Sequence, residues 1–342
     1  MDTLTQPKII VTGGDGFLGT YVVKLLQDQG VRNVFVPRSK HYDLYELENV
    51  HRLFRDYPPD LVIHLASSCP LSQESNNHND PYNQPDMCMC KNILAAAQQH
   101  TVPEVVTVLD YHSYPGWCDH PLSEDDLEDL SNWNAKDAGN LLGATYLKEV
   151  VEKNHTLGEK SNIITCITSE IYGPGDRFQV QSRRLLAAAI RIISDAKEQQ
   201  DSEAIIPGHP DDEIDFLYIT EAVDGIVAAI KSDVTSGIIN LALGKTHRWR
   251  NVVEQVVAYL EYDGEMSWME TDRQPRQVAF NVSRAKDRTG FNPSIGVEVG
   301  LQETVQWFCT HRRFILENEA DTMVQWQTSH HNQQITDAVF VK

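Results

Sequence analysis

The stretch KIIVTGGDGFLG, residues 8–19, joins a short apolar run to a turn rich in glycine. The run 8–12 has the composition of a buried strand, and the amphipathic pattern that continues to about residue 29 predicts a helix. Gly13, Gly16 and Gly19 form a G-x-x-G-x-x-G pattern where the run meets the helix. One such glycine permits a tight turn, one lets the backbone approach a pyrophosphate, and one allows close helix–strand packing. The stretch predicts a dinucleotide-binding turn at a helix N-terminus, to which Phe17 and Leu18 also contribute.

Further apolar runs follow at the spacing of alternating strands and helices. Strands are predicted at 33–37, 61–66, 104–109 and 162–167, and helices at about 46–56, 86–100 and 141–154. This alternation predicts an α/β fold, a Rossmann-type doubly wound parallel sheet with right-handed crossovers. Later helices are predicted at about 182–198, 220–231, 249–261 and 297–312. We expect a dinucleotide-binding domain over 1–168, a smaller C-terminal α/β substrate domain over 169–320 with parts that interleave with the first, and an irregular tail over 321–342.

Composition and charge narrow the classes of partner. The formal net charge of −20 argues against a nucleic-acid partner, because a protein that binds nucleic acid needs a basic face for the phosphates. No apolar run approaches the roughly 20 residues of a membrane span, and the first residues lack the pattern of a signal peptide. The six cysteines form no CxxC pair, so no metal site is expected. We expect a cytoplasmic protein with reduced cysteines, and we expect the acidic residues of 124–129 to lie on a solvated loop.

The residues after the second predicted strand indicate which dinucleotide binds. An acid at this position would bind the ribose hydroxyls of NAD, but the chain has Arg38, Ser39 and Lys40 here. Two cations and a hydroxyl suit a 2′-phosphate, which favours NADP over NAD; the alternative is a solvated loop. Asp43 lies where an acid could reach the adenine amino group. Leu65, Ala66 and Ser67 follow the third strand as further cofactor candidates, and Ser68 is a substrate candidate.

Three short motifs carry a resemblance to a known family: TGGDGFLG at 12–19, HLAS at 64–67 and YGPGD at 172–176. They resemble the extended short-chain dehydrogenase/reductases, the NAD(P)-dependent epimerase/dehydratase family. Residues 37–44, 86–97 and 271–308 are similar to its GDP-fucose synthase branch, and the resemblance covers about residues 8–312. It implies reduction or epimerisation of a 4-keto nucleotide sugar by a tyrosine acid/base, helped by a lysine four residues later. It also implies a homodimer through helices at about 86–100 and 137–154.

The chain departs from this family at the acid–base site. None of its twelve tyrosines is followed four residues later by lysine. An ungapped comparison with the family's helix puts Lys136 at the tyrosine position and Asn140 at the lysine position, while the serine or threonine position falls on Tyr111. Arg184 falls near a histidine that acts as acid/base in fucose synthases. Arg276 matches a position that contacts substrate phosphate, so both arginines are substrate candidates.

Two functional hypotheses stay open. In the first, Tyr111 is the acid/base, Lys136 supplies the positive charge that lowers the phenol's pKa, and His112 assists. In the second, the chain is a non-catalytic relative that holds NADP and acts through a protein partner. A further alternative places the acid/base at Tyr146 or Tyr172.

Overall fold

The computed structural model describes residues 6–67, 85–114, 120–128, 162–179, 184–232, 234, 236–269 and 273–317. The chain divides into two compact units. Unit 1 comprises Met1–Ser169, Ala222–Ala242 and Phe280–Asn292, and unit 2 comprises Glu170–Glu221, Leu243–Ala279 and Pro293–Lys342. Unit 1 is therefore built from three separate lengths of chain.

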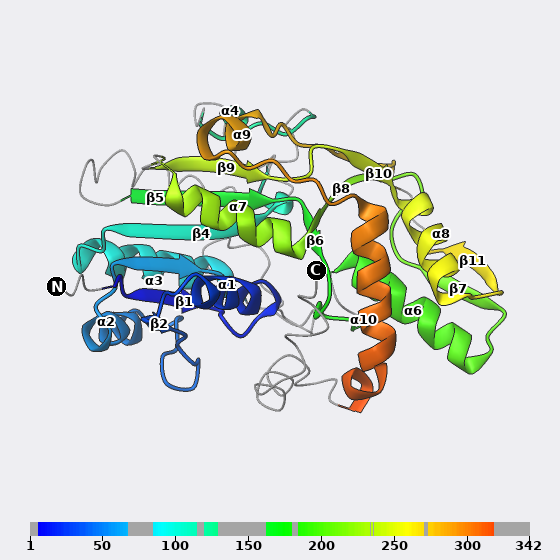
Figure 1. Cartoon of the computed structure of the whole chain (residues 1–342), viewed down its shortest axis with the longest axis horizontal. Coiled ribbons are helices and arrows are strands. Elements are labelled where there is room, and N and C mark those ends of the chain that lie inside the picture. The colour runs from blue at the N-terminus through cyan, green and yellow to red at the C-terminus, as the bar shows by residue number, and fades with distance from the viewer. Residues whose placement is uncertain are drawn as a thin grey trace. The chain divides into compact units, whose positions relative to one another are not determined.

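A parallel sheet of six strands forms the centre of unit 1 (Figure 1). In spatial order the strands are β2 (Val34–Phe35), β1 (Ile9–Thr12), β3 (Leu61–His64), β4 (Glu104–Asp110), β5 (Asn162–Thr168) and β9 (Gly237–Leu241). All five pairings are parallel, which confirms the predicted Rossmann-type sheet. The strand order reverses at β1, which has β2 on one side and β3 on the other, and ligands of such sheets bind at this point.

The described helices of unit 1 are α1 (Phe17–Asp28), α2 (Leu47–Asp56), α3 (Pro85–Gln99), the short α4 (Asp125–Glu128), most of α7 (Ile219–Lys231), and α9 (Ser283–Thr289). Four of them, α1, α2, α3 and α7, lie close to predicted positions, whereas α4 and α9 were not predicted. Apolar side chains of α2 and α3, including Phe54 and Ile93, pack on Ile10, Val62 and Val105 of the sheet. Strand β2 is shorter than the predicted 33–37 and ends before Pro37, which has no backbone N–H to donate.

One expectation about the acidic run 124–129 was wrong. Asp125 is exposed, but Glu124 is only 2% exposed, and its Oε1 accepts a hydrogen bond of 2.8 Å from the backbone N–H of Asn240 in β9. The Asn240 side chain donates to Leu122 O at 3.0 Å, and Arg284 donates to Ile238 O at 3.3 Å. Strand β9 is the last of the sheet, and its unpaired backbone groups need partners. Glu124 is buried because it supplies one of them.

Unit 2 is also an α/β structure. Strands β6 (Glu170–Tyr172), β8 (Glu213–Tyr218), β10 (Thr246–Arg248) and β12 (Gln277–Val278) form one mixed sheet, and β7 (Glu203–Ile206) pairs with β11 (Glu265–Trp268). Helices α6 (Leu185–Gln199), α8 (Trp249–Leu260) and α10 (Val297–Glu317) correspond to three of the predicted helices. Buried aromatic rings fill the core, with Phe216 beside Trp249 and Phe178 beside Phe308.

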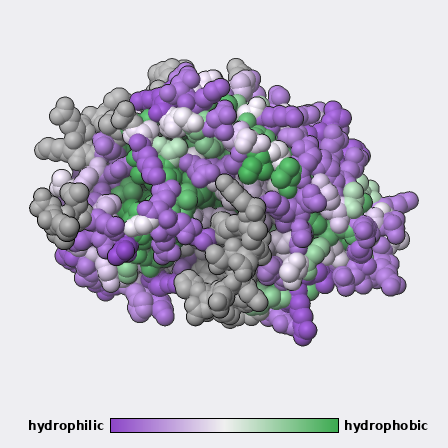
Figure 2. All heavy atoms as spheres, viewed as in Figure 1, coloured by the Kyte–Doolittle hydropathy of each residue, from purple (hydrophilic) through white to green (hydrophobic). Residues whose placement is uncertain are grey.

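The face of the molecule drawn in Figure 2 carries mainly polar side chains among the described residues. Figure 2 shows hydrophilic side chains over most of the viewed face, with smaller apolar areas between them. Among the described residues, no helix is both long and apolar enough to cross a bilayer.

Candidate cofactor and substrate site

The glycine turn follows β1 at the reversal of strand order in unit 1. Gly13 has a left-handed φ of +67°, and its carbonyl oxygen accepts a hydrogen bond of 2.9 Å from Gly16 N. Gly16 is the N-cap of α1, with an extended backbone. The first N–H groups of a helix have no partner within it, so the turn presents donors to an anion.

The packing around Gly13, Gly14 and Gly19 leaves no room for a Cβ atom at these positions. A Cβ atom on Gly19 would lie 2.1 Å from Gly13 O, and one on Gly13 would lie 2.6 Å from Ala66 N. Gly14, for which no role was predicted, is also closely packed: its Cβ would lie 2.7 Å from a methyl group of Val36. The GG doublet was the signal for it. The bare backbone of this turn fits the close approach of a dinucleotide's pyrophosphate.

A buried chain of hydrogen bonds supports the turn from below. Thr12 Oγ1 lies 2.7 Å from His64 Nδ1, and His64 Nε2 lies 3.2 Å from Cys90 Sγ. Burial lowers the pKa of His64 to about 4, so its ring is neutral at neutral pH. Ala66 N donates to Thr12 Oγ1 at 3.4 Å. The candidates Leu65, Ala66 and Ser67 thus begin beside Gly13, and His64, which had no predicted role, helps to hold them there.

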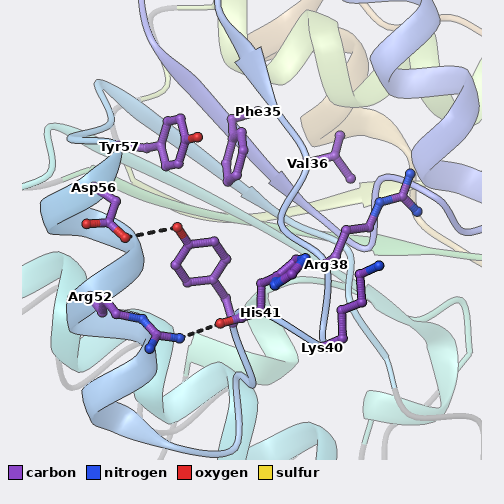
Figure 3. Close-up of a pocket in the computed structure, with 9 residues that line it drawn as sticks. Phe35, Val36, Arg38, Lys40, His41, Arg52, Asp56 and Tyr57 are labelled. Atoms are coloured by element: carbon purple, nitrogen blue, oxygen red, sulfur yellow. Dashed lines mark hydrogen bonds between the residues drawn. The ribbon is translucent and has the colours of Figure 1, made fainter.

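The predicted NADP-selecting segment lines a cavity of about 730 Å³ (Figure 3). The lining residues are Phe35, Val36, Arg38, Lys40, His41, Tyr42, Arg52, Asp56 and Tyr57. Three of them are arginine or lysine and one is a carboxylate, so the cavity is basic in a strongly acidic chain. Figure 3 shows Arg38 and Lys40 extending in the same direction, away from the aromatic pair Phe35 and Tyr57, whose rings stack at 3.6 Å. Ser39 is exposed between the two cations.

Helices α2 and α3 hold the loop that carries these cations. Tyr42 donates to Asp56 of α2 at 2.9 Å, and the guanidinium of Arg52 donates to His41 O and lies over the Tyr42 ring. Asn92 of α3 donates to Leu44 O and Tyr45 O, each at 2.9 Å. The loop is therefore fixed without a ligand, which reduces the entropy lost on binding.

Two carboxylates near this loop have partners of their own. Asp43 accepts a hydrogen bond from Tyr45 N at 3.0 Å, an Asx turn that engages one of its oxygens. Asp15, within the glycine turn, forms an ion pair with Arg38. No role was predicted for Asp15, because nothing in the sequence pattern brings residues 15 and 38 together.

Tyr111 and His112 lie where β4 ends, in the short helix η2 (Tyr111–Ser113). Tyr111 is 8% exposed, and its ring stacks on that of His112 at 4.0 Å. Asp110 accepts a hydrogen bond of 3.0 Å from His112 N and lies 3.4 Å from the His112 imidazole. Lys136 and Asn140, like Ser68 and Tyr146, lie outside the described residues.

Tyr172, the other tyrosine considered as an acid/base, is enclosed in unit 2. It is 1% exposed, and a Cβ on Gly300 of α10 would lie 2.4 Å from its hydroxyl oxygen. Burial, followed by nearby carboxylates led by Glu221, raises the pKa of Tyr172. A phenol so enclosed is unsuited to exchange protons with a substrate.

The two predicted substrate arginines lie in unit 2, each beside a buried aspartate. Arg184, at the N-cap of α6, donates to Asp176 at 3.1 Å and also to Ile171 O. Arg276 and Arg273 both pair with Asp212, at 3.7 and 2.5 Å. Burial tends to raise the pKa of Asp212, but hydrogen bonds and charge from the two arginines hold it below its usual range. Arg276 and Arg273 remain 42% and 37% exposed, so they present positive charge to solvent.

The fold and the glycine turn define an α/β protein with a dinucleotide-binding turn. A family model described as the NAD dependent epimerase/dehydratase family matches residues 9–242, and the chain belongs to this family. It is a nucleotide-sugar epimerase/reductase-like member of the extended short-chain dehydrogenase/reductases, which confirms the resemblance stated above.

Individual relatives are distant but cover nearly the whole chain. GDP-L-fucose synthase 1 of Arabidopsis thaliana is 24% identical over 88% of this chain and 93% of its own. GDP-L-colitose synthase of Yersinia pseudotuberculosis is 22% identical over 89% and 99%. A GDP-L-fucose synthetase from Naegleria fowleri, solved bound to NADP, has a TM-score of 0.74 at 22% identity over 91% and 95%. At this identity the solved structure shows the shared fold.

Proposed function

We propose that this protein binds NADP in preference to NAD and acts on a nucleotide sugar, with its acid–base site rebuilt around Tyr111. The basic cavity beside the glycine turn carries the cofactor proposal. Arg38 and Lys40 line it and Ser39 lies between them, so this segment offers positive charge and a hydroxyl to a 2′-phosphate. The NADP-bound relative from Naegleria fowleri gives further support.

The cofactor proposal is tested by titrating the protein with NADPH and NADH and following nicotinamide fluorescence. Arg38→Met should weaken NADPH binding about tenfold, because a charge-assisted contact to phosphate is lost, and should change NADH binding far less. Arg55→Met is the matched control, since Arg55 pairs with Glu48 on α2 and does not line the cavity. Tighter binding of NADH by the wild type, or equal losses for both cofactors in Arg38→Met, would contradict the proposal.

For catalysis, we propose that the Tyr111 hydroxyl gives its proton to the sugar's 4-keto oxygen. NADPH, when bound, supplies the hydride. Tyr111 follows β4 at the carboxyl edge of the sheet, where ligands of this fold bind, and His112 and Asp110 lie beside it to exchange protons with solvent. Lys136 is assigned the positive charge that favours the phenolate. The phosphates of the nucleotide sugar are assigned to Arg276, supported by Arg273, and Arg184 stays a substrate candidate.

Activity is tested by NADPH absorbance with a panel of 4-keto nucleotide sugars, starting with a GDP-linked one. Tyr111→Phe should lower turnover by about a hundredfold or more while leaving the affinity for NADPH unchanged, because only the proton donor is removed. Tyr259→Phe, which alters an exposed phenol on α8, is the control. Full turnover by Tyr111→Phe would rule out this role.

One observation favours a second candidate function, a non-catalytic NADP-binding subunit that acts through a protein partner. Arg184 lies near the position of the family's acid/base histidine, and its guanidinium is engaged by Asp176. A guanidinium does not release its proton in a protein, so it cannot replace that histidine. Binding of NADPH without its consumption by any 4-keto sugar would favour this function over the first.

We further propose a homodimer in the cytoplasm. The family resemblance supports the dimer, and the absence of any disulfide among the described cysteines supports a reducing compartment. Sedimentation of the purified protein tests the dimer.

A further inference from the structure

We propose that Asp15 is a specificity-determining residue. Its carboxylate competes with the 2′-phosphate for Arg38 and so lowers the affinity for NADP relative to that for NAD. This inference rests on the proposed binding of NADP. The observation behind it is the ion pair between Arg38 Nη1 and Asp15 Oδ2. The side chain proposed to receive a phosphate is thus already paired with a carboxylate of the same protein.

The pair is set by backbone packing as well as by two flexible side chains. Asp15 lies between Gly14 and Gly16, and the Gly14 backbone packs so closely on Val36 that a Cβ would lie 2.7 Å from a Val36 methyl group. Arg38 follows Val36 by two residues. The turn and the end of β2 are therefore packed against each other, which keeps the Asp15 backbone close to the loop that carries Arg38.

A 2′-phosphate at Arg38 must either displace the Asp15 carboxylate or lie close to it. Displacement loses the ion pair, and proximity adds repulsion between like charges. The ribose hydroxyl of NAD neither displaces the Asp15 carboxylate nor is repelled by it, because a hydroxyl can donate a hydrogen bond to a carboxylate. Asp15 therefore disfavours NADP relative to NAD, while Lys40 and Arg52 keep the cavity basic.

The Asp15 charge also lies at the N-terminus of α1, where it repels the pyrophosphate that both cofactors share. That effect cancels in a ratio of affinities. The measured quantity is therefore the NADPH-to-NADH affinity ratio, determined by fluorescence titration of the full-length protein at low and at high ionic strength.

Asp15→Asn keeps the shape of the side chain and removes its charge. It should raise the NADPH-to-NADH affinity ratio about threefold to tenfold, and the gain should shrink as salt screens the charges. Asp28→Asn is the matched control, because Asp28 forms a comparable exposed ion pair with Lys24 at the far end of α1; it should leave the ratio unchanged. Asp15→Ser provides a second uncharged variant should Asp15→Asn fold poorly.

A double-mutant cycle assigns the effect to the pair. In an Arg38→Met background, Asp15→Asn should change the ratio much less than it does in the wild type. A ratio that stays constant or falls in both uncharged variants, while the wild type binds NADPH, would overturn the inference and leave the proposed function intact. A wild type that binds neither cofactor would instead overturn the proposed function, and the inference with it.

Discussion

Gly19 and His64 show how single residues shape the cofactor site. A Cβ on Gly19 would overlap Gly13 O, so helix α1 can approach the turn only as long as this position has no side chain. His64 supports the turn through hydrogen bonds with Thr12 and Cys90 in a buried position. Close packing at Gly19 and the hydrogen bonds of His64 therefore both fix the turn.

Burial of His64 makes stability depend on pH. Its pKa falls from 6.5 to about 4 on folding, so the unfolded chain binds more protons between these values, and stability is lost as the pH falls from 6.5. The loss is at most about 1.4 kcal/mol for each pH unit in this window. His64→Gln should be less stable at pH 7 and should lose this part of the pH dependence, measured by urea denaturation from pH 7 to pH 4.

The control for this prediction is His41→Gln, which replaces an exposed imidazole and leaves the buried one in place. It should keep the wild-type pH dependence. An unchanged slope in His64→Gln would show that other groups cause it.

At the scale of elements, the segments that connect strands and helices supply cofactor-site residues and cover an exposed strand edge. The loop after β2 carries the cations of the cofactor pocket, and α2 and α3 fix it through Asp56, Arg52 and Asn92. The segment before α4 serves a structural purpose, because Leu122 and Glu124 bind the outer edge of β9.

Glu124→Ala should lower the free energy of unfolding by about 1–3 kcal/mol, because it leaves the buried Asn240 N–H without its acceptor. Glu124→Gln should cost less, since its amide oxygen can still accept. Burial raises the pKa of Glu124, so its ionisation costs stability as the pH rises above 4.5, and the glutamine variant should gain on the wild type there. Urea denaturation at pH 4.5 and pH 7 measures both effects.

Asp125→Asn is the control, because Asp125 is an exposed partner of Arg284 and such pairs contribute little. Its free energy of unfolding should stay within about 0.5 kcal/mol of the wild type. A similar loss in Asp125→Asn and Glu124→Ala would contradict the special role of the buried acid.

At the scale of the whole molecule, the two units are built from lengths of chain that alternate along the sequence. The sheet of unit 1 is completed only by β9, which comes after the whole first length of unit 2. The family match likewise extends from residue 9 to residue 242, beyond the first five strands of the sheet. Cofactor-binding candidates lie in unit 1, and the arginines assigned to substrate phosphate lie in unit 2.

The sequence by itself determined the local features. Apolar runs and their spacing predicted the first five strands of the sheet and the principal helices. Burial of one face gives the apolar residues of a helix a characteristic spacing, and a buried strand is a short apolar run. The glycine spacing predicted the turn, because only glycine allows such close backbone approach. The sequence also shows that no tyrosine of the chain has a lysine four residues later.

Only the tertiary structure decided which distant residues meet. The Asp15–Arg38 pair joins the turn after β1 to the loop after β2, and Glu124 is buried by a strand edge more than a hundred residues further along the chain. The enclosure of Tyr172 by α10 is of the same kind. The sequence pattern of a helix or strand predicts which of its faces is apolar. Whether a given charged or polar residue is buried or paired depends on which other element packs against it.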